Sequence, residues 1–132
     1  SATALKLRLD LVFGRYIRLR DCINTTWSRS YGVCITSKER IPFERWDCWH
    51  FQSRRHLNTR WDERNCHFQS KADNNWWAGE QYKHWKAIDE LYGEWTADEL
   101  LRLSGIMFKP TTEWYQEKIA YYSEKVKEME EM

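Results

Sequence analysis

Polar side chains between residues 47 and 74 are of the types that metal-assisted cleavage of a phosphodiester requires. Asp47 and His50 lie three residues apart, and Asn65, His67 and Asn74 follow. A carboxylate and an amide oxygen can hold a divalent cation such as Mg²⁺ or Mn²⁺, and a neutral imidazole can deprotonate water. The competing interpretation is structural, because a single histidine among aromatic residues more often serves as a hydrogen-bonding group of the core.

Basic side chains surround these candidates and suit a phosphate backbone. Guanidinium groups bind phosphate oxygens through two parallel hydrogen bonds, which positions a nucleic acid strand. The candidate DNA contacts are Arg54, Arg55, His56, Arg60 and Arg64, with Arg15 and Arg18 nearer the N-terminus. For each of the last two taken alone, a solvated helix face is the simpler interpretation.

The net charge of +1 conceals an asymmetry along the chain. Residues 1–71 hold 14 basic and 7 acidic side chains, a net +7, whereas residues 72–132 hold 7 and 13, a net −6. A basic half indicates a face that binds a polyanion. Ordinary helix-surface charge is the alternative, so the asymmetry alone does not decide for nucleic acid.

The N-terminal half predicts one helix followed by short strands. Apolar side chains recur at three- and four-residue spacing over residues 4–22, which is typical of an amphipathic helix. Residues 33–53 are rich in β-branched and aromatic types and predict strands, whereas the polar residues 54–64 predict a loop. In a regular strand, alternation would place Asp47 and His50 on opposite faces, so they would converge only at a bulge or at the strand end.

The C-terminal half predicts three helices. The first runs from Asp73 to about Tyr92 and ends at Gly93. The stretch "TADE" predicts Thr96 as the N-cap of a short helix that ends near Gly105. A last helix, roughly 111–130, carries an apolar seam that packs against the domain or against a partner helix. The predicted fold is a single α+β domain over residues 1–132, mainly helical.

Five stretches of the sequence are long and specific: "FGRYIRLRDC", "GVCIT", "DCWHFQSRRHL", "TRWDERNCH" and "GEQY". Together they resemble the phage NinG (Rap) recombination proteins, which are small HNH-like nucleases that act on branched recombination intermediates. The resemblance runs from about residue 4 to residue 104. It implies a ββα-metal core at 33–92, between the N-terminal helix and two C-terminal helices at 96–131.

The resemblance also implies roles for single residues. His50 matches the histidine that would be the general base, and Asp47 begins the same stretch as a candidate metal ligand. Asn65 matches the asparagine that braces the loop between the two strands in HNH motifs. Asn74 matches a position at the helix start where HNH proteins place another metal ligand, and His67 is a further candidate ligand.

The chain departs from this family at a structural zinc knuckle built from two CxxC pairs. The corresponding residues here are Cys34, Ser37, Ser70 and Asp73. Closed structural zinc sites use Cys and His, so we expect no structural zinc. Large aromatic residues, such as Trp49 where the family has Gly, lead to the hypothesis that packing has replaced the zinc, through drift or deliberate redesign.

Three functions remain open from the sequence. The first is a metal-dependent endonuclease that acts on branched or single-stranded DNA. The second is a catalytically inactive relative that binds DNA, and the third is a natural or redesigned scaffold that binds another protein. The last helix could support a homodimer. Four unpaired cysteines, without a signal peptide or a membrane span, favour a cytoplasmic protein.

Overall fold

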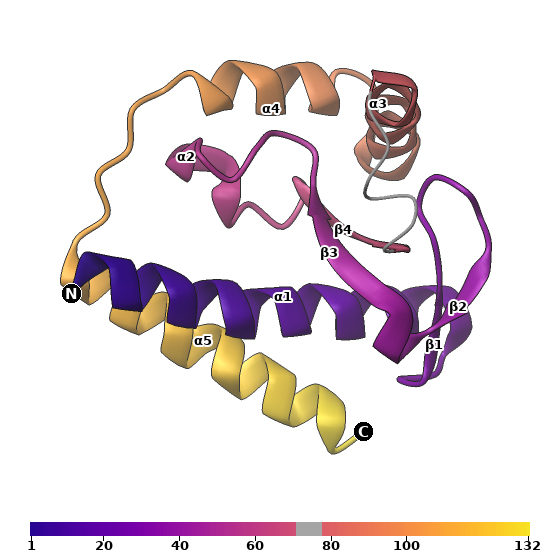
Figure 1. Ribbon diagram of the computed structural model, residues 1–132, viewed down its shortest axis with the longest axis horizontal. Coiled ribbons are helices and arrows are strands. Elements are labelled where there is room, and N and C mark those ends of the chain that lie inside the picture. The colour runs from indigo at the N-terminus through magenta and orange to yellow at the C-terminus, as the bar shows by residue number, and fades with distance from the viewer. Residues whose placement is uncertain (71–77) are drawn as a thin grey trace.

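The computed structural model describes residues 1–70 and 78–132 of the chain. Within these ranges it confirms a mainly helical α+β fold, with five α-helices and two small antiparallel sheets (Figure 1). The helices are α1 (Ala2–Thr26), α2 (Leu57–Arg60), α3 (Ala78–Tyr92), α4 (Thr96–Ser104) and α5 (Thr112–Glu130). The strands are β1 (Tyr31–Val33), β2 (Arg40–Pro42), β3 (Trp46–His50) and β4 (Cys66–Ser70).

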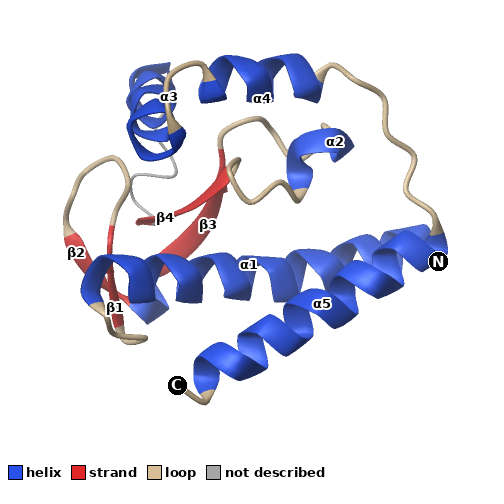
Figure 2. Ribbon diagram, turned by 180° about the vertical axis from the view of Figure 1, so that it is seen from behind, coloured by secondary structure: helices blue, strands red, loops and turns tan. Residues whose placement is uncertain are grey.

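The long helices α1 and α5 lie side by side (Figures 1 and 2). The apolar stripe predicted for the N-terminal helix is buried between them, and the ring of Phe13 meets that of Tyr122 edge-on at 4.9 Å between centroids. The apolar seam of α5 therefore packs against the domain itself, since Tyr115, Tyr122 and Val126 are buried with α1. The helix α1 is longer at both ends than the predicted range 4–22.

The predicted strand region is divided between two sheets. β1 pairs with β2, β3 pairs with β4, and a short 3-10 turn (Phe43–Arg45) separates β2 from β3. The two sheets share a small apolar core in which the indole of Trp46 stacks on the ring of Phe68. That indole also donates a hydrogen bond of 2.7 Å from Nε1 to the Ile41 carbonyl, which ties β3 to β2.

Helix boundaries differ from the prediction at two places. The polar segment predicted as a loop contains the single helical turn α2. α3 ends before Gly93 as predicted, and the φ of 113° at that glycine explains why a glycine stands there. Thr96, however, is the first residue of α4 rather than its N-cap, and the Asp89 carboxylate of α3 accepts the hydrogen bond of the Ala97 amide instead.

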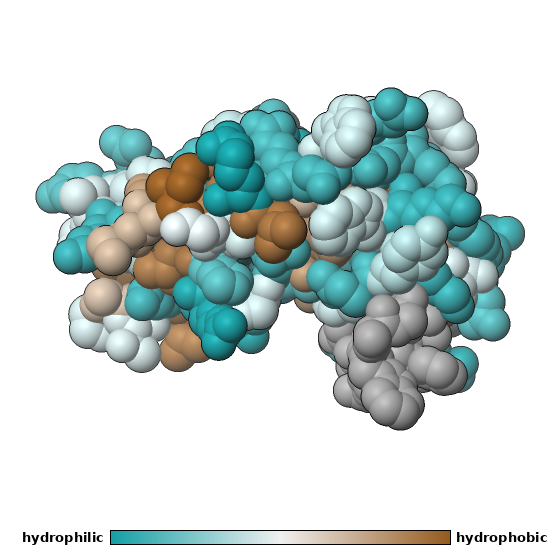
Figure 3. Space-filling view, turned by 90° about the horizontal axis from the view of Figure 1, so that it is seen from above, coloured by the Kyte–Doolittle hydropathy of each residue, from teal (hydrophilic) through white to brown (hydrophobic). Residues whose placement is uncertain are grey.

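Apolar side chains remain exposed on α4 and the linker that follows it. Leu101, Ile106 and Met107 are exposed there, as are Leu7 and Leu11 on α1. Figure 3 shows apolar surface on the left half of the view from above, the half in which that linker runs. None of the described helices has the combination of length and apolar character that a bilayer crossing requires.

Candidate functional site

The β3–β4 pair presents two faces to two different helices. His50 lies opposite Cys66 and Cys48 lies opposite Phe68 in the antiparallel register. Cys48 faces α1, because a Cβ placed on Gly14 would lie 3.7 Å from the Cβ of Cys48. Trp49 faces α3, where its ring stacks on His84 at 4.4 Å between centroids. Because side chains alternate along a strand, His50 lies on the α1 face with Cys48, and Asp47 lies on the α3 face with Trp49.

This arrangement separates two of the predicted catalytic residues. Asp47 lies on the α3 face with Trp49, whereas His50 lies on the opposite face of the same strand. The strand has no bulge at this point, since the register is continuous from Trp46 to His50. Strand alternation therefore does not by itself bring Asp47 beside His50, and the expectation that Asp47 holds an ion there stays a prediction. The large Trp49 ring points away from His50, so it does not block the imidazole.

The His50 imidazole is held in one orientation by the loop after β3. Its Nε2 lies 2.9 Å from the Arg60 carbonyl oxygen, which can only accept, so Nε2 carries the proton and Nδ1 keeps its lone pair. Burial lowers the pKa of His50 to about 4, so the ring is neutral at pH 7. His50 lines a groove against α1 together with Asp10, Leu11 and Arg54.

The buried Asn65 side chain makes hydrogen bonds across the loop between β3 and β4. Its Nδ2 donates to the carbonyls of Gln52 and Thr59 at 3.0 and 3.1 Å, and its Oδ1 accepts from the Gln52 amide at 2.8 Å. The Asn65 carbonyl accepts the Phe51 amide as well. A single buried side chain thus braces both ends of the loop between β3 and β4, which supplies the carbonyl that orients His50.

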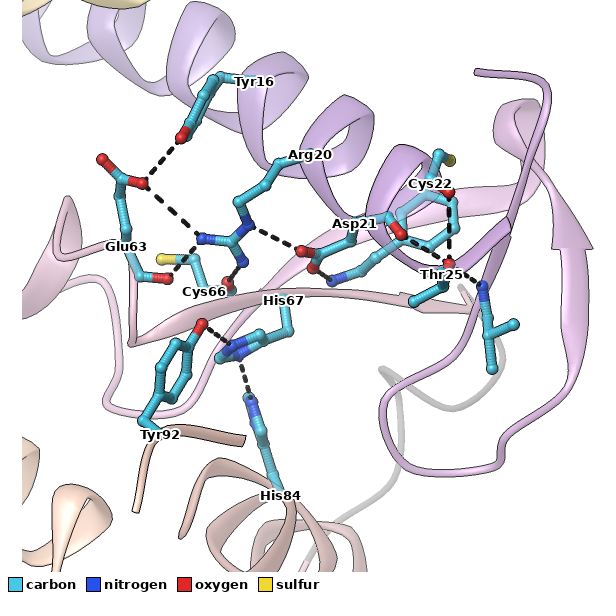
Figure 4. A network of polar contacts seen from close by, with 12 residues as sticks. Tyr16, Arg20, Asp21, Cys22, Thr25, Glu63, Cys66, His67, His84 and Tyr92 are labelled. Carbon is cyan, nitrogen blue, oxygen red and sulfur yellow. Dashed lines mark hydrogen bonds and ion pairs between the residues drawn. The ribbon is translucent and has the colours of Figure 1, made fainter. Parts of the chain in front are cut away.

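His67, predicted as a metal ligand, has both ring nitrogens engaged in the protein. Nδ1 lies 3.0 Å from His84 Nε2, and Nε2 lies 2.8 Å from the Tyr92 hydroxyl (Figure 4). Burial lowers the pKa of both histidines well below the usual value. Asn74 lies outside the described residues, so the convergence of the predicted Mg²⁺ or Mn²⁺ ligands stays a prediction.

A second polar network joins α1 to β4 (Figure 4). Arg20 donates to the carbonyls of Glu63 and Cys66 at 2.8 and 2.9 Å and pairs with Asp21 at 2.7 Å. Asp21 in turn accepts the Phe68 amide at 2.9 Å. These bonds fix β4 on α1 and thereby position Cys66.

Most of the arginines predicted to bind DNA have carboxylate partners within the chain. Arg54 and Arg60 both donate to Asp10, Arg64 pairs with Asp62 and Glu99, and Arg15 pairs with Glu130. The other two arginines have different surroundings: Arg18 lies over the ring of Phe43, and Arg55 is exposed. The backbone of His56, the remaining candidate, caps α2. Only Arg54 of the paired set lines the groove beside His50, and half of its side chain is exposed.

The described residues at the positions that correspond to the family's zinc knuckle make hydrogen bonds and pack against aromatic rings. Cys34 Sγ lies 3.4 Å from Thr36 Oγ1, which accepts a hydrogen bond of 2.9 Å from Gln69 Nε2. Ser37 is exposed, Ser70 is buried at the end of β4, and Asp73 lies outside the described residues. The stacked rings described above pack beside Cys34 in the same core. That this packing has replaced a zinc ion stays a hypothesis.

Sequence reasoning missed three residues that the structure brings to His50. The Sγ atoms of Cys48 and Cys66 and one ring nitrogen of His50 lie within 4.8 Å of one another, and no other such group of three occurs among the residues described. Asp10 is the third, held by Arg54, Arg60 and the Trp61 indole. The Cys-x-His spacing in β3 was a usable signal, since residues i and i+2 share a face, but Cys66 required the strand register.

Comparison with known proteins adds no further constraint. No protein-family model matches the chain, no curated protein matches it, and no solved structure matches its fold. The assignment of a function therefore depends on the residues and on the geometry given above.

Proposed function

We propose that the chain hydrolyses phosphodiesters of branched or single-stranded DNA at the groove beside His50. The observation that supports this proposal is the fixed orientation of one neutral imidazole, whose Nε2–H is donated to the Arg60 carbonyl. Asn65 braces the loop that supplies this carbonyl, as the resemblance to HNH-like nucleases implies. A positioned imidazole with a free lone pair is the group that general-base catalysis needs.

The chemistry follows from that orientation. Nδ1 of His50 would accept a proton from a water molecule whose oxygen attacks phosphorus, and the ester oxygen on the opposite side would leave. Arg54 at the groove and the exposed Arg55 would bind the phosphate oxygens. A bound Mg²⁺ or Mn²⁺ would supply charge neutralisation. We keep the reducing cytoplasm as the proposed compartment, because the four cysteines are thiols rather than disulfides.

A catalytically inactive DNA-binding relative is the second candidate. It is favoured by the separation of Asp47 from His50 on opposite faces of β3, because a hydrolase of the HNH class would need the two side by side. Partner proteins and a homodimer stay predictions, since the seam that would support a dimer is packed on α1.

A cleavage assay on a branched DNA separates the two candidates. Wild type is compared with His50→Gln in Mg²⁺ or Mn²⁺, because glutamine keeps an N–H for the Arg60 carbonyl but cannot take up a proton at pH 7. We expect cleavage by wild type and a loss of about 100-fold or more in the variant, with unchanged DNA affinity. DNA binding without cleavage by wild type would support the second candidate, and absence of salt-sensitive DNA binding would overturn both.

A further inference from the structure

We propose that Cys48, His50 and Cys66 form a binding site for a thiophilic divalent cation, Zn²⁺ being the physiological choice. The site is distinct from the vacated knuckle, which would have used Cys34, and it goes beyond the proposed hydrolysis because it needs no DNA. Its three ligand atoms already lie within 4.8 Å of one another. Zn²⁺ binds thiolate sulfur at about 2.3 Å and imidazole nitrogen at about 2.0 Å, so ligands of one ion lie roughly 3 to 4 Å apart.

The register of β3 and β4 creates this cluster. Cys48 and His50 share one face because they are two residues apart in β3, and Cys66 stands opposite His50 in β4. Two thiols and one imidazole from two paired strands are a ligand set that excludes Mg²⁺ and Ca²⁺, which prefer oxygen ligands. The chemistry of the donors therefore selects a soft or borderline ion.

The surroundings of His50 are those of a metal ligand. A ligating histidine usually donates its other N–H to a carbonyl or carboxylate, which fixes the tautomer and the ring plane. His50 has this partner in the Arg60 carbonyl at 2.9 Å, so Nδ1 is the nitrogen left for an ion. The same carbonyl lies 3.6 Å from Cys66 Sγ, which places both ligands against one loop.

An ion can reach the cluster and complete its coordination from the groove. Cys48 and His50 line the groove against α1, whereas Cys66 is fully buried behind them. Gly14 of α1 leaves room above Cys48, because a Cβ at this position would lie 3.7 Å from the Cβ of Cys48. Three protein ligands leave a fourth tetrahedral position for water, as in catalytic rather than structural zinc sites.

Binding would release protons and remove a burial penalty. The Cys66 sulfur is fully buried, so a thiolate there would have the cation as its countercharge. Each thiol that becomes a thiolate ligand releases its proton to solvent, so about two protons should leave per ion bound. The two thiolates then balance the charge of the divalent cation inside the domain.

Cobalt titration of the reduced full-length chain tests the site directly. Co²⁺ replaces Zn²⁺ in Cys/His sites and gives thiolate charge-transfer absorption together with the d–d bands of tetrahedral geometry. We expect one equivalent of Co²⁺ to produce both signals and one equivalent of Zn²⁺ to bleach them. Cys48→Ser should weaken Co²⁺ binding by about tenfold or more, and His50→Gln should do likewise.

Cys34→Ser is the matched control, since Cys34 is a buried thiol of the vacated knuckle. It should bind Co²⁺ as the wild type does. Circular dichroism verifies the fold of each variant, and the half-buried Cys48 is chosen as the principal variant because Cys66→Ser alters a fully buried position. Absence of thiolate charge transfer in the wild type, unchanged Co²⁺ affinity in Cys48→Ser, or loss of binding in Cys34→Ser would overturn the proposal.

Discussion

His67 on β4 and His84 on α3 share a buried hydrogen bond of 3.0 Å between Nδ1 and Nε2. With the Tyr92 hydroxyl on the other nitrogen of His67, the pair joins the two-stranded sheet to the helix that follows it. The other nitrogen of His84 is buried without a partner among the described residues. Both rings are thus held neutral, since a second proton would be a charge enclosed by aromatic side chains.

The first prediction is a loss of stability in mild acid. Burial keeps the pKa of His67 and His84 in the folded state well below the unfolded value of about 6.5. The unfolded chain therefore binds more protons below that pH, so the stability is complete above pH 6.5 and declines as the pH falls from there toward the folded values. Each histidine contributes a slope of up to about 1.4 kcal/mol per pH unit.

Urea unfolding of metal-free protein between pH 7.5 and pH 5 measures this slope. His84→Gln keeps an amide toward His67 but cannot be protonated in this range. Unfolding of the variant should therefore take up about one proton fewer, and its unfolding free energy should depend less steeply on pH. Equal slopes in wild type and variant would show that His84 is already charged in the folded state.

The second prediction concerns Asp10, which accepts from Arg54, Arg60 and the Trp61 indole. Burial alone would raise the pKa of Asp10, but the hydrogen bonds and charges of the two arginines outweigh it and hold the pKa below its usual value. Asp10→Asn leaves the half-buried Arg60 without its countercharge, so we expect a loss of about 2 kcal/mol in unfolding free energy. Glu128→Gln, on an exposed pair with Lys125, should change it by less than about 0.5 kcal/mol.

The third prediction uses two glycines and opposite signs. A Cβ on Gly32 would lie no more than 3.0 Å from three atoms of the Phe68 ring, so Gly32→Ala should cost about 1–3 kcal/mol through overpacking. Gly14 is in the middle of α1 and a Cβ there makes ordinary contact, so Gly14→Ala should gain about 0.5–1 kcal/mol. Chemical denaturation measures the unfolding free energy of the two variants. An unchanged value for Gly32→Ala would show that the Phe68 ring moves aside.

The fourth prediction tests whether packing has replaced zinc. Trp46→Ala removes the buried indole that stacks on Phe68, so it should cost about 3–5 kcal/mol. Trp27→Ala, at a position that is 92% exposed, should be nearly neutral by comparison. In a Cys48→Ser background, a chelator should leave the melting temperature unchanged. A melting temperature lowered by the chelator would mean that an ion is bound at the knuckle positions around Cys34.

The fifth prediction joins the two proposals. A cation on His50 would occupy the same Nδ1 lone pair that hydrolysis needs, so one equivalent of Zn²⁺ should inhibit Mg²⁺-dependent DNA cleavage by wild type. Cys48→Ser should resist this inhibition, because its cation affinity is lower. Inhibition of both proteins at the same Zn²⁺ concentration would place the inhibitory ion elsewhere.

Local pattern was sufficient to predict the four longer helices of this fold, but not the single turn α2. The three- and four-residue spacing of Leu9, Phe13 and Tyr16 predicted a buried stripe, and all three are buried. The stop of α3 at Gly93 also follows from local chemistry. At Thr96 the same reasoning was wrong, because the Ala97 amide donates to the Asp89 carboxylate of the preceding helix instead.

Long-range pairing is the reason that the site was predicted only in part. The bracing role of Asn65 came from a motif, and its hydrogen bonds agree with it. The cluster of Cys48 with Cys66 depends on a strand register set across a loop of fifteen residues, for which the sequence holds no local signal. The partners of Arg54 are equally distant, since Asp10 precedes it by 44 residues.

The packing of α5 on α1 has a consequence for how the chain folds as it is synthesised. The stripe of α1 emerges from the ribosome first, yet the residues that cover it, such as Tyr122 and Val126, are made about a hundred residues later. Contacts of such large sequence separation slow folding and leave apolar surface open to other chains meanwhile. We therefore expect the nascent chain to need shielding of α1 until its last helix has been translated.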